Sequence, residues 1–249
     1  MTHQNNNGQT DGTSSNRIKV LRYDRIVDSN NPECKDEGCI SLGEFRHHLD
    51  LFELWRYTPI TFDDYRLSLK GEIGLPSKPI ILTFDHAYED NYLFSFPVMQ
   101  KFGVKGVVFA SGNRQISQTD APPKSSLPSA HLMSDQALLE MHTAGFEIGS
   151  HGLGYTNLTH LSTEKASEEI SRSRVLLEIL LNAPVLTFAY PFGAVTPVVK
   201  QLVAQSGYTI GCGLDAGPRL FTSDPFEIRR VSMMKHYNAV TLHAKLLFA

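Results

Sequence analysis

Short apolar runs alternate with amphipathic stretches along most of this chain. The runs have the length of buried strands, and the stretches repeat apolar residues at a helical period. The predicted strands are residues 19–23, 80–84, 105–110, 146–148, 185–190 and 208–212. The predicted helices are residues 41–55, 63–69, 92–102, 134–143, 162–181 and 197–205. This repetition, without a linker or an internal repeat, predicts a single α/β domain with a mainly parallel sheet that closes into a barrel.

Capping residues mark the predicted helix boundaries. Ser41 with Glu44 has the spacing of a capping box, Gly103 suits a left-handed C-cap, and Pro184 prevents the helix at 162–181 from continuing. The polar, Pro- and Ser-rich stretch 112–128 is expected to be a long loop beside the carboxyl ends of the strands, as a candidate lid.

Composition narrows the class of protein. The 249 residues are 41% hydrophobic and 20% charged, as in ordinary globular proteins. A formal net charge of -3 gives no reason to expect nucleic acid or an anionic membrane as a partner. Residues 1–17 are polar and are expected to form a disordered tail, which leaves 18–249 as the folded domain.

Cysteine content and hydropathy indicate the cellular compartment of the protein. The odd count and wide scatter of Cys34, Cys39 and Cys212 favour a reduced chain, although a Cys34–Cys39 pair could form under oxidising conditions. No stretch has the length of a membrane span or the apolar core of a signal peptide. We therefore expect a cytoplasmic protein, and the sequence indicates no oligomeric state.

Polar side chains follow three of the predicted strands. Asp85 and His86 come directly after the run at 80–84, His151 follows the strand at 146–148, and Phe192 follows the strand at 185–190. Catalytic groups collect at the carboxyl ends of parallel strands, so Asp85 and His86 are a candidate reactive pair. The equally weighted alternative is that Asp85 caps the next helix.

These stretches resemble the polysaccharide deacetylases, the NodB-homology family of metal-dependent carbohydrate N-deacetylases. The resemblance covers about residues 19–246. It is carried by Thr83-Phe84-Asp85, Glu89-Asp90-Asn91-Tyr92, Glu147-Ile148-Gly149-Ser150-His151, Asn157-Leu158-Thr159, Phe188-Ala189-Tyr190-Pro191-Phe192-Gly193 and the segment 224–230.

The resemblance implies a distorted, TIM-like β/α barrel of seven or eight mainly parallel strands. It also implies hydrolysis of acetyl groups from an N-acetylated oligo- or polysaccharide, with a divalent metal, zinc, polarising the carbonyl and activating water. Asp85 matches the general base, and the backbone N–H of Phe192 would contact the oxyanion. Arg229 or Arg230 matches the arginine that steadies the base. The candidate substrate-binding residues are Tyr190, Pro191 and Tyr88.

The chain departs from the family pattern at the metal ligands. His151 matches a ligand, but His86 stands where an Asp is expected, and Tyr155 stands where the second His is expected. Asp24 in turn stands where an N-terminal His is expected. The expected ligands are therefore His86, His151 and Tyr155, with the hypothesis that Asp24 compensates for His86 across the rim.

One further residue and the activity itself are left with two interpretations. His243 resembles the family's late general acid, but it equally fits a C-terminal amphipathic helix, which we favour. The retained Asp85, Phe192 and arginine favour an active deacetylase. The altered ligands favour an inactive family member that binds a glycan or a partner protein.

Overall fold

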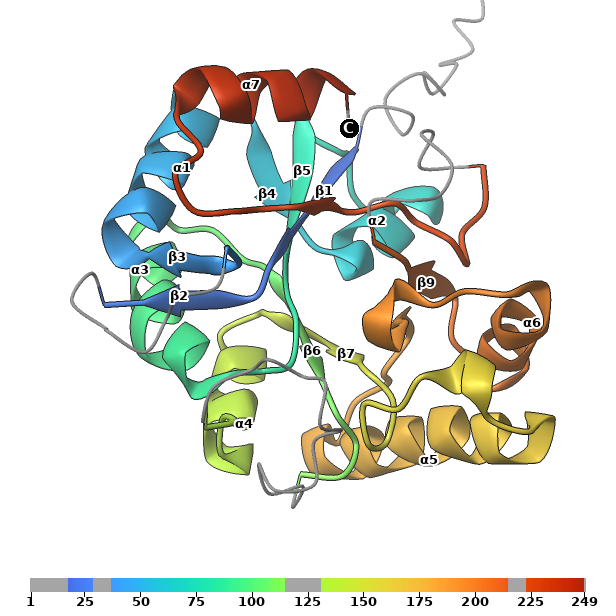
Figure 1. The fold of residues 1–249 in the computed structure, drawn as a ribbon. Coiled ribbons are helices and arrows are strands. Elements are labelled where there is room, and N and C mark those ends of the chain that lie inside the picture. Colours follow the sequence, from blue (N-terminus) through green and yellow to red (C-terminus); the bar gives the residue numbers. More distant parts are fainter. Residues whose placement is uncertain (1–17, 29–36, 115–130, 215–222, 249) are drawn as a thin grey trace, which may run out of the picture.

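The protein folds as a curled parallel sheet wrapped by helices (Figure 1). The computed structural model describes residues 18–28, 37–114, 131–214 and 223–248. The strands of the main sheet are β1 (Lys19–Tyr23), β4 (Thr58–Ile60), β5 (Pro79–Phe84), β6 (Val107–Ala110), β7 (Glu147–Ser150), β8 (Thr187–Ala189), β9 (Ile210–Cys212) and β10 (Val231–Ser232). Their order is β10-β1-β5-β6-β7-β8-β9, with β4 also beside β5. Every pairing is parallel, and the result is the predicted distorted β/α barrel.

Strand β5 lies in the middle of this sheet. It pairs with β1 along its length, with β4 at its start and with β6 at its end. Its side chains alternate between two cores, because Ile80, Leu82 and Phe84 join the cluster beneath the helices, whereas Ile81 joins the cluster inside the barrel. The same period of two directs Asp85 to the interior side of the barrel.

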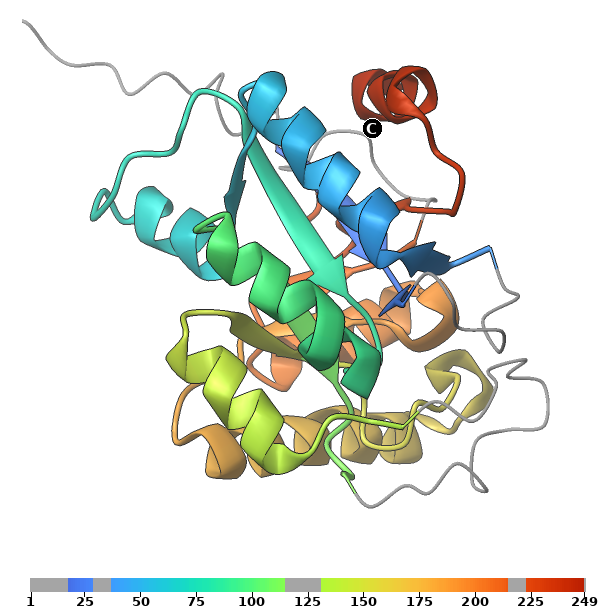
Figure 2. The same cartoon turned by 90° about the vertical axis from the view of Figure 1, so that its left-hand side faces the viewer.

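The helices cover the outside of the sheet. They are α1 (Leu42–Leu54), α2 (Phe62–Leu69), α3 (Phe96–Lys101), α4 (Asp135–Thr143), α5 (Thr163–Leu181), α6 (Pro197–Gln205) and α7 (Ala239–Phe248). Figure 2 shows α1, α3, α4 and α5 following one another around the sheet. The capping box at the start of α1 is formed, with Glu44 N–H donating to Ser41 Oγ at 3.2 Å. No helix of the described residues is long and apolar enough to cross a membrane.

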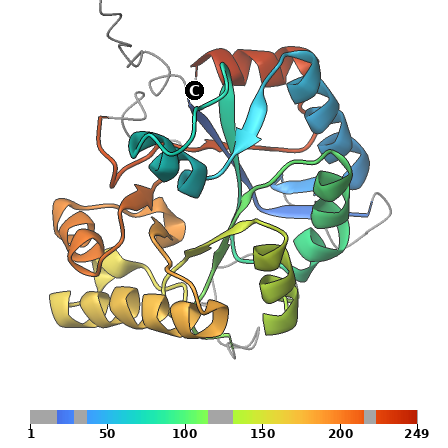
Figure 3. The ribbon, with the colours of Figure 1, turned by 180° about the vertical axis from the view of Figure 1, so that it is seen from behind.

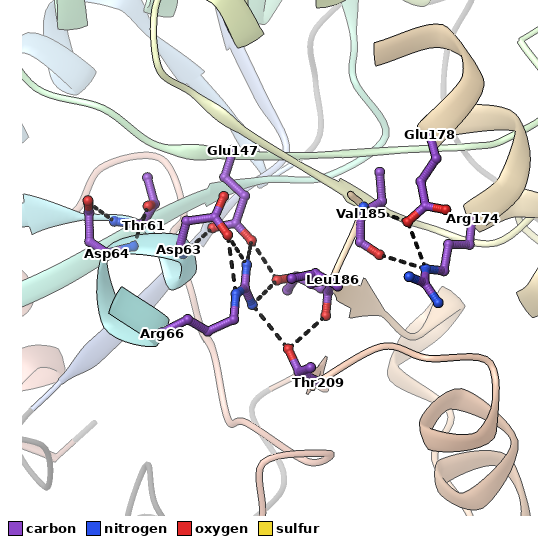
Figure 4. A network of polar contacts seen from close by, with 11 residues as sticks. Thr61, Asp63, Asp64, Arg66, Glu147, Arg174, Glu178, Val185, Leu186 and Thr209 are labelled. Carbon is purple, nitrogen blue, oxygen red and sulfur yellow. Dashed lines mark hydrogen bonds and ion pairs between the residues drawn. The ribbon is translucent and has the colours of Figure 1, made fainter. Parts of the chain in front are cut away.

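Helix α2 lies at the end of the barrel where the strands begin (Figure 3). Its Arg66 reaches the first residues of β7 and β8, donating to Glu147 at 2.7 Å and to Thr187 at 3.0 Å. Glu147 also accepts from the Thr187 hydroxyl at 2.5 Å and from the Asp63 N–H at 2.9 Å (Figure 4). This buried network ties α2 to the sheet at the end opposite Asp85, so we assign it to stability.

Several local features differ from the sequence expectations. A second, two-stranded parallel sheet of β2 (Arg25–Val27) and β3 (Cys39–Ser41) occurs where no strand was predicted. The helix predicted at 92–102 begins as a π-helical turn, Asn91–Ser95, before α3. Both differences follow from length, since strands of three residues and a single widened turn leave no periodic signal.

Further expectations concern the cysteines, the N-terminal tail and the candidate lid. Cys39 is disulfide-bonded and Cys212 is a buried free thiol. The predicted reduced chain is therefore wrong, because an odd cysteine count is compatible with one disulfide and one thiol. The tail 1–17, Cys34 and most of the candidate lid lie outside the described residues.

Candidate functional site

Asp85 lies directly after β5, at the carboxyl end of the central strand. Its backbone N–H donates to the Tyr23 carbonyl at 3.0 Å. The Arg230 guanidinium donates to both carboxylate oxygens, at 2.6 and 3.0 Å, and Nε of Arg22 donates to Oδ2 at 2.7 Å. Asp85 is only 2% exposed, so protein groups satisfy most of this carboxylate. Residues 86–87 form a turn, and Asp85 therefore does not serve as the predicted helix cap.

The two arginines decide the charge of Asp85. Burial raises the pKa of this carboxyl, but the charges of Arg230 and Arg22 outweigh burial and hold the pKa well below its usual range. Asp85 is therefore ionised throughout the neutral pH range and binds protons only weakly.

Arg22 belongs to the site although it was not predicted from the sequence. The sheet register places it opposite Thr83 of β5 and Ser232 of β10, next to the end of both strands. The available signal was a single arginine between apolar residues near the end of β1. Of the two arginines proposed from the sequence, Arg230 contacts Asp85 and is fully buried. Arg229 is partly exposed, and its buried Nε has no hydrogen-bond partner in the part of the chain that the structure describes.

His151 and His86 form a pair of neutral imidazoles. His151 Nδ1 lies 2.8 Å from the Ala189 carbonyl oxygen, which can only accept, so Nδ1 carries the proton. Nε2 is buried and finds no partner among the described residues. The two rings lie 5.0 Å apart between centroids. Burial lowers the pKa of His151 to about 4, and burial is also the largest cause that lowers the pKa of His86 well below its usual value.

Tyr155 lies against both imidazoles and against Phe192. Its ring centroid is 4.3 Å from that of His86, 4.8 Å from that of His151 and 4.6 Å from that of Phe192. Burial raises the pKa of the phenol to about 12, while a hydrogen bond from the Phe192 backbone acts in the opposite direction. The phenol therefore keeps its proton at neutral pH. The structure thus places Tyr155, which the family resemblance implied, beside His151 at this rim.

Backbone strain is concentrated at these residues. His86, Ala87, Tyr155 and Phe192 have φ values of 68°, 51°, 53° and 59°, in the left-handed region that side chains other than glycine rarely adopt. Such a conformation costs on the order of 1–3 kcal/mol per residue, and it persists where the surrounding structure imposes it, often at functional sites. Three separate strand ends contribute strained residues to the same rim.

Asp24 does not provide the expected partner for His86. Its carboxylate accepts a hydrogen bond from Arg22, and Oδ2 lies close to Gly38. Burial raises the pKa of Asp24, and the charge of Arg22 opposes that shift. Arg22 thus links Asp24 to Asp85. Among the residues that the structure describes, no contact supports the proposed compensation between Asp24 and His86.

Three expected substrate contacts are largely buried. Tyr190 is fully buried, and its hydroxyl donates to the Phe226 carbonyl at 2.7 Å. Pro191 is buried at the start of the turn Pro191–Gly193, and Tyr88 is 3% exposed beneath Arg25. Phe192, by contrast, is 42% exposed. Among the rim residues named here, Phe192 is the most exposed, and Tyr155, Arg22 and Asp24 are partly exposed.

His243 lies far from these groups. It is exposed on α7, and its ring packs edge-on against Trp55 at 5.0 Å between centroids. Trp55 ends α1 just before β4 begins, at the opposite end of the barrel from Asp85. The helical interpretation of this segment is therefore confirmed, and the structure does not bring His243 to the site as a general acid.

The residues at the rim do not fit the expected zinc site. A catalytic metal usually has three protein ligands, and His86 with His151 supplies two nitrogens. Among the residues that the structure describes, no three His, Cys, Asp or Glu side chains are grouped to hold a metal ion. The third expected ligand, Tyr155, remains protonated, and Asp24 is engaged by Arg22. We therefore derive no chemical step through a metal.

The fold and the rim define a β/α-barrel protein with its site at the carboxyl ends of the strands. A sequence profile described as polysaccharide deacetylase matches residues 73–211. The chain belongs to this family. The family match and the fold indicate polysaccharide deacetylase function, and members of the family generally depend on a metal.

Individual relatives are more distant. YxkH of Bacillus subtilis (strain 168), a provisionally assigned polysaccharide deacetylase, is 22% identical over 215 residues, which are 86% of this chain and 71% of YxkH. The structure of the Streptococcus pyogenes deacetylase PplD in complex with acetate matches with a TM-score of 0.78 at 18% identity, covering 92% of this chain and 97% of PplD. IcaB from Ammonifex degensii matches with a TM-score of 0.74 at 22% identity, covering 93% and 97%. These structures support the barrel fold.

Proposed function

We propose that this chain removes acetyl groups from N-acetylated oligo- or polysaccharides at the rim around Asp85. The family match supports this class of reaction. The observation that carries the location is a set of strained residues at the same end of the barrel as the ionised Asp85. They follow three strands and are His86, Ala87, Tyr155 and Phe192. The reaction consumes water and yields a free sugar amine and acetate.

The roles of the protein groups follow from their surroundings. Asp85 orients the attacking water by accepting a hydrogen bond from it, and Arg230 with Arg22 fixes the carboxylate. Because its pKa is held so low, Asp85 is a weak base, and its chief contribution is positioning. The exposed ring of Phe192 offers an apolar face to a sugar ring.

Zinc was the metal expected from the sequence. His86 and His151 would supply two nitrogen ligands. One of them, Nε2 of His151, is buried and has no hydrogen-bond partner among the described residues. The set lacks the third ligand, so zinc is not part of the proposal.

A second candidate function is binding of an N-acetylated glycan without hydrolysis. The observation that favours it is that Arg230 and Arg22 both donate hydrogen bonds to the Asp85 carboxylate. These bonds leave Asp85 with little capacity to accept a proton. It differs from the first candidate in one measurable product, acetate.

Acetate release from N-acetylglucosamine oligomers tests the proposed function. The wild-type protein is assayed after treatment with chelator and again with added zinc or cobalt. We expect acetate release, and we expect Asp85→Asn to lower it at least tenfold while Asp50→Asn, an exposed aspartate on α1, leaves it unchanged. Thermal unfolding of both variants confirms that each is folded. Binding without acetate release in either condition would support the second candidate instead.

A further inference from the structure

Tyr155 stands at the centre of the rim. Its ring touches His86, His151 and Phe192, which come from three different strand ends. Its own backbone is strained, with φ of 53°. A side chain that only filled space at position 155 would not need a strained backbone. The strain therefore suggests that the position of the phenol has a function.

The Tyr155 hydroxyl is placed where a ligand can reach it. Tyr155 is partly exposed, and its ring lies against Phe192, which is 42% exposed at the rim. A phenol O–H can donate a hydrogen bond to an acceptor oxygen. The hydroxyl is therefore available to an acceptor oxygen that enters the rim.

The groups at the rim favour recognition by a neutral donor. A phenol has an ordinary pKa of about 10 and is therefore an uncharged donor at neutral pH. Among the described residues, no three His, Cys, Asp or Glu side chains are grouped to hold a metal ion. A carbonyl oxygen that enters beside the Tyr155 ring would find the phenol as an uncharged donor.

We propose that the Tyr155 hydroxyl donates a hydrogen bond to the acetamide carbonyl oxygen of the bound sugar, so that recognition of the acetyl group requires no divalent metal. This inference rests on the proposed function, because it assumes that an N-acetylated sugar occupies the rim. It makes Tyr155 the residue that distinguishes an acetylated sugar from the free amine.

Calorimetric titration of the full chain, treated with chelator, tests this proposal with two ligands. One is a tetramer of N-acetylglucosamine, and the other is the corresponding tetramer of glucosamine. Tyr155→Phe keeps the ring contacts and removes only the hydroxyl. We expect it to weaken binding of the acetylated tetramer about tenfold, as for the loss of one hydrogen bond, and to leave binding of the glucosamine tetramer unchanged.

The control is Tyr92→Phe, which removes a phenol hydroxyl that donates to Glu140 at 2.7 Å on the outside of the barrel. We expect this variant to bind both tetramers as the wild type does. Circular dichroism melting of both variants establishes that each is folded.

Two results would overturn the proposal while the proposed function stands. One is equal affinity of wild type and Tyr155→Phe for the acetylated tetramer. The other is wild-type binding that is lost with chelator and restored by zinc. If the wild type binds neither tetramer and releases no acetate, the proposed function fails, and this inference fails with it.

Cobalt absorption gives a readout that does not depend on activity. We expect chelator-treated wild type to show no spectrum of bound Co²⁺ at neutral pH. The double variant His86→Asp and Tyr155→His has one carboxylate and, with His151, two imidazole donors, and it is expected to show such a spectrum. A cobalt spectrum in the wild type that His151→Ala abolishes would contradict the metal-free account.

Discussion

The guanidinium of Arg230 donates to both carboxylate oxygens of Asp85, and neither side chain is more than 2% exposed. Arg230 Nε also donates to the Gly213 carbonyl at 2.8 Å, so the pair joins β5 to two segments near the C-terminus. Asp85 thus has a structural role as well as its proposed role at the rim.

Removing one partner of this pair should strongly destabilise the fold. Arg230→Met leaves Asp85 buried with only Arg22, and we expect a loss of about 3–5 kcal/mol in the free energy of unfolding. Urea denaturation at pH 7 measures it. Arg172→Met removes an arginine whose exposed pair with Glu168 should contribute no more than about 0.5 kcal/mol. Similar losses in the free energy of unfolding for the two variants would show that the buried pair contributes no more to stability than the exposed pair.

The network around Glu147 should affect stability and not ligand binding. Glu147→Ala leaves Arg66 of α2 without its buried carboxylate at the start of β7, so we expect a loss of about 3 kcal/mol. Because this network lies at the opposite end of the barrel from Asp85, the folded variant should bind the acetylated tetramer as the wild type does. Glu168→Gln, on the exposed face of α5, is the matched control. A change in tetramer affinity in Glu147→Ala would indicate coupling between the two ends.

The buried His48 should make the folded protein less stable in mild acid. It is 1% exposed on α1, with Nδ1 3.3 Å from the Tyr23 hydroxyl, and burial lowers its pKa to about 4. In the unfolded chain this histidine has its ordinary pKa of 6.5, so between pH 6.5 and about 4 the unfolded state binds more protons than the folded state. Its contribution to stability is therefore complete above pH 6.5 and is lost as the pH falls towards 4.

The variant His48→Gln isolates this effect from the other buried histidines. Between pH 7 and 4 the wild type should lose about 3 kcal/mol more than the variant in the free energy of unfolding. Urea denaturation across this range measures the difference. Parallel pH profiles for the two proteins would show that His48 does not titrate differently in the folded state.

Local signals predicted much of the fold. The capping box of Ser41 and Glu44 and the apolar run of β5 depend only on neighbouring residues, and both occur as expected. Strands β2 and β3 were missed because three residues of strand in a polar segment carry no measurable period.

The site was predictable only where one motif carried it. Asp85 and His151 were identified from their position after strands, Tyr155 was implied by the family resemblance, and the structure brings all three to one rim. Arg22 was missed because its role depends on the register of β1 against both β5 and β10. The contact of Asp24 depends on the same register, because Arg22 donates a hydrogen bond to the Asp24 carboxylate. Neither contact can be deduced from residue types alone.

The most direct test of the account is the time course of acetate release from the N-acetylglucosamine tetramer by chelator-treated wild-type protein, followed by mass spectrometry beside Tyr155→Phe. The account predicts deacetylated products from the wild type without added metal, and about tenfold slower formation by the variant. Products that appear only after zinc is added, or no products in either condition, would contradict it.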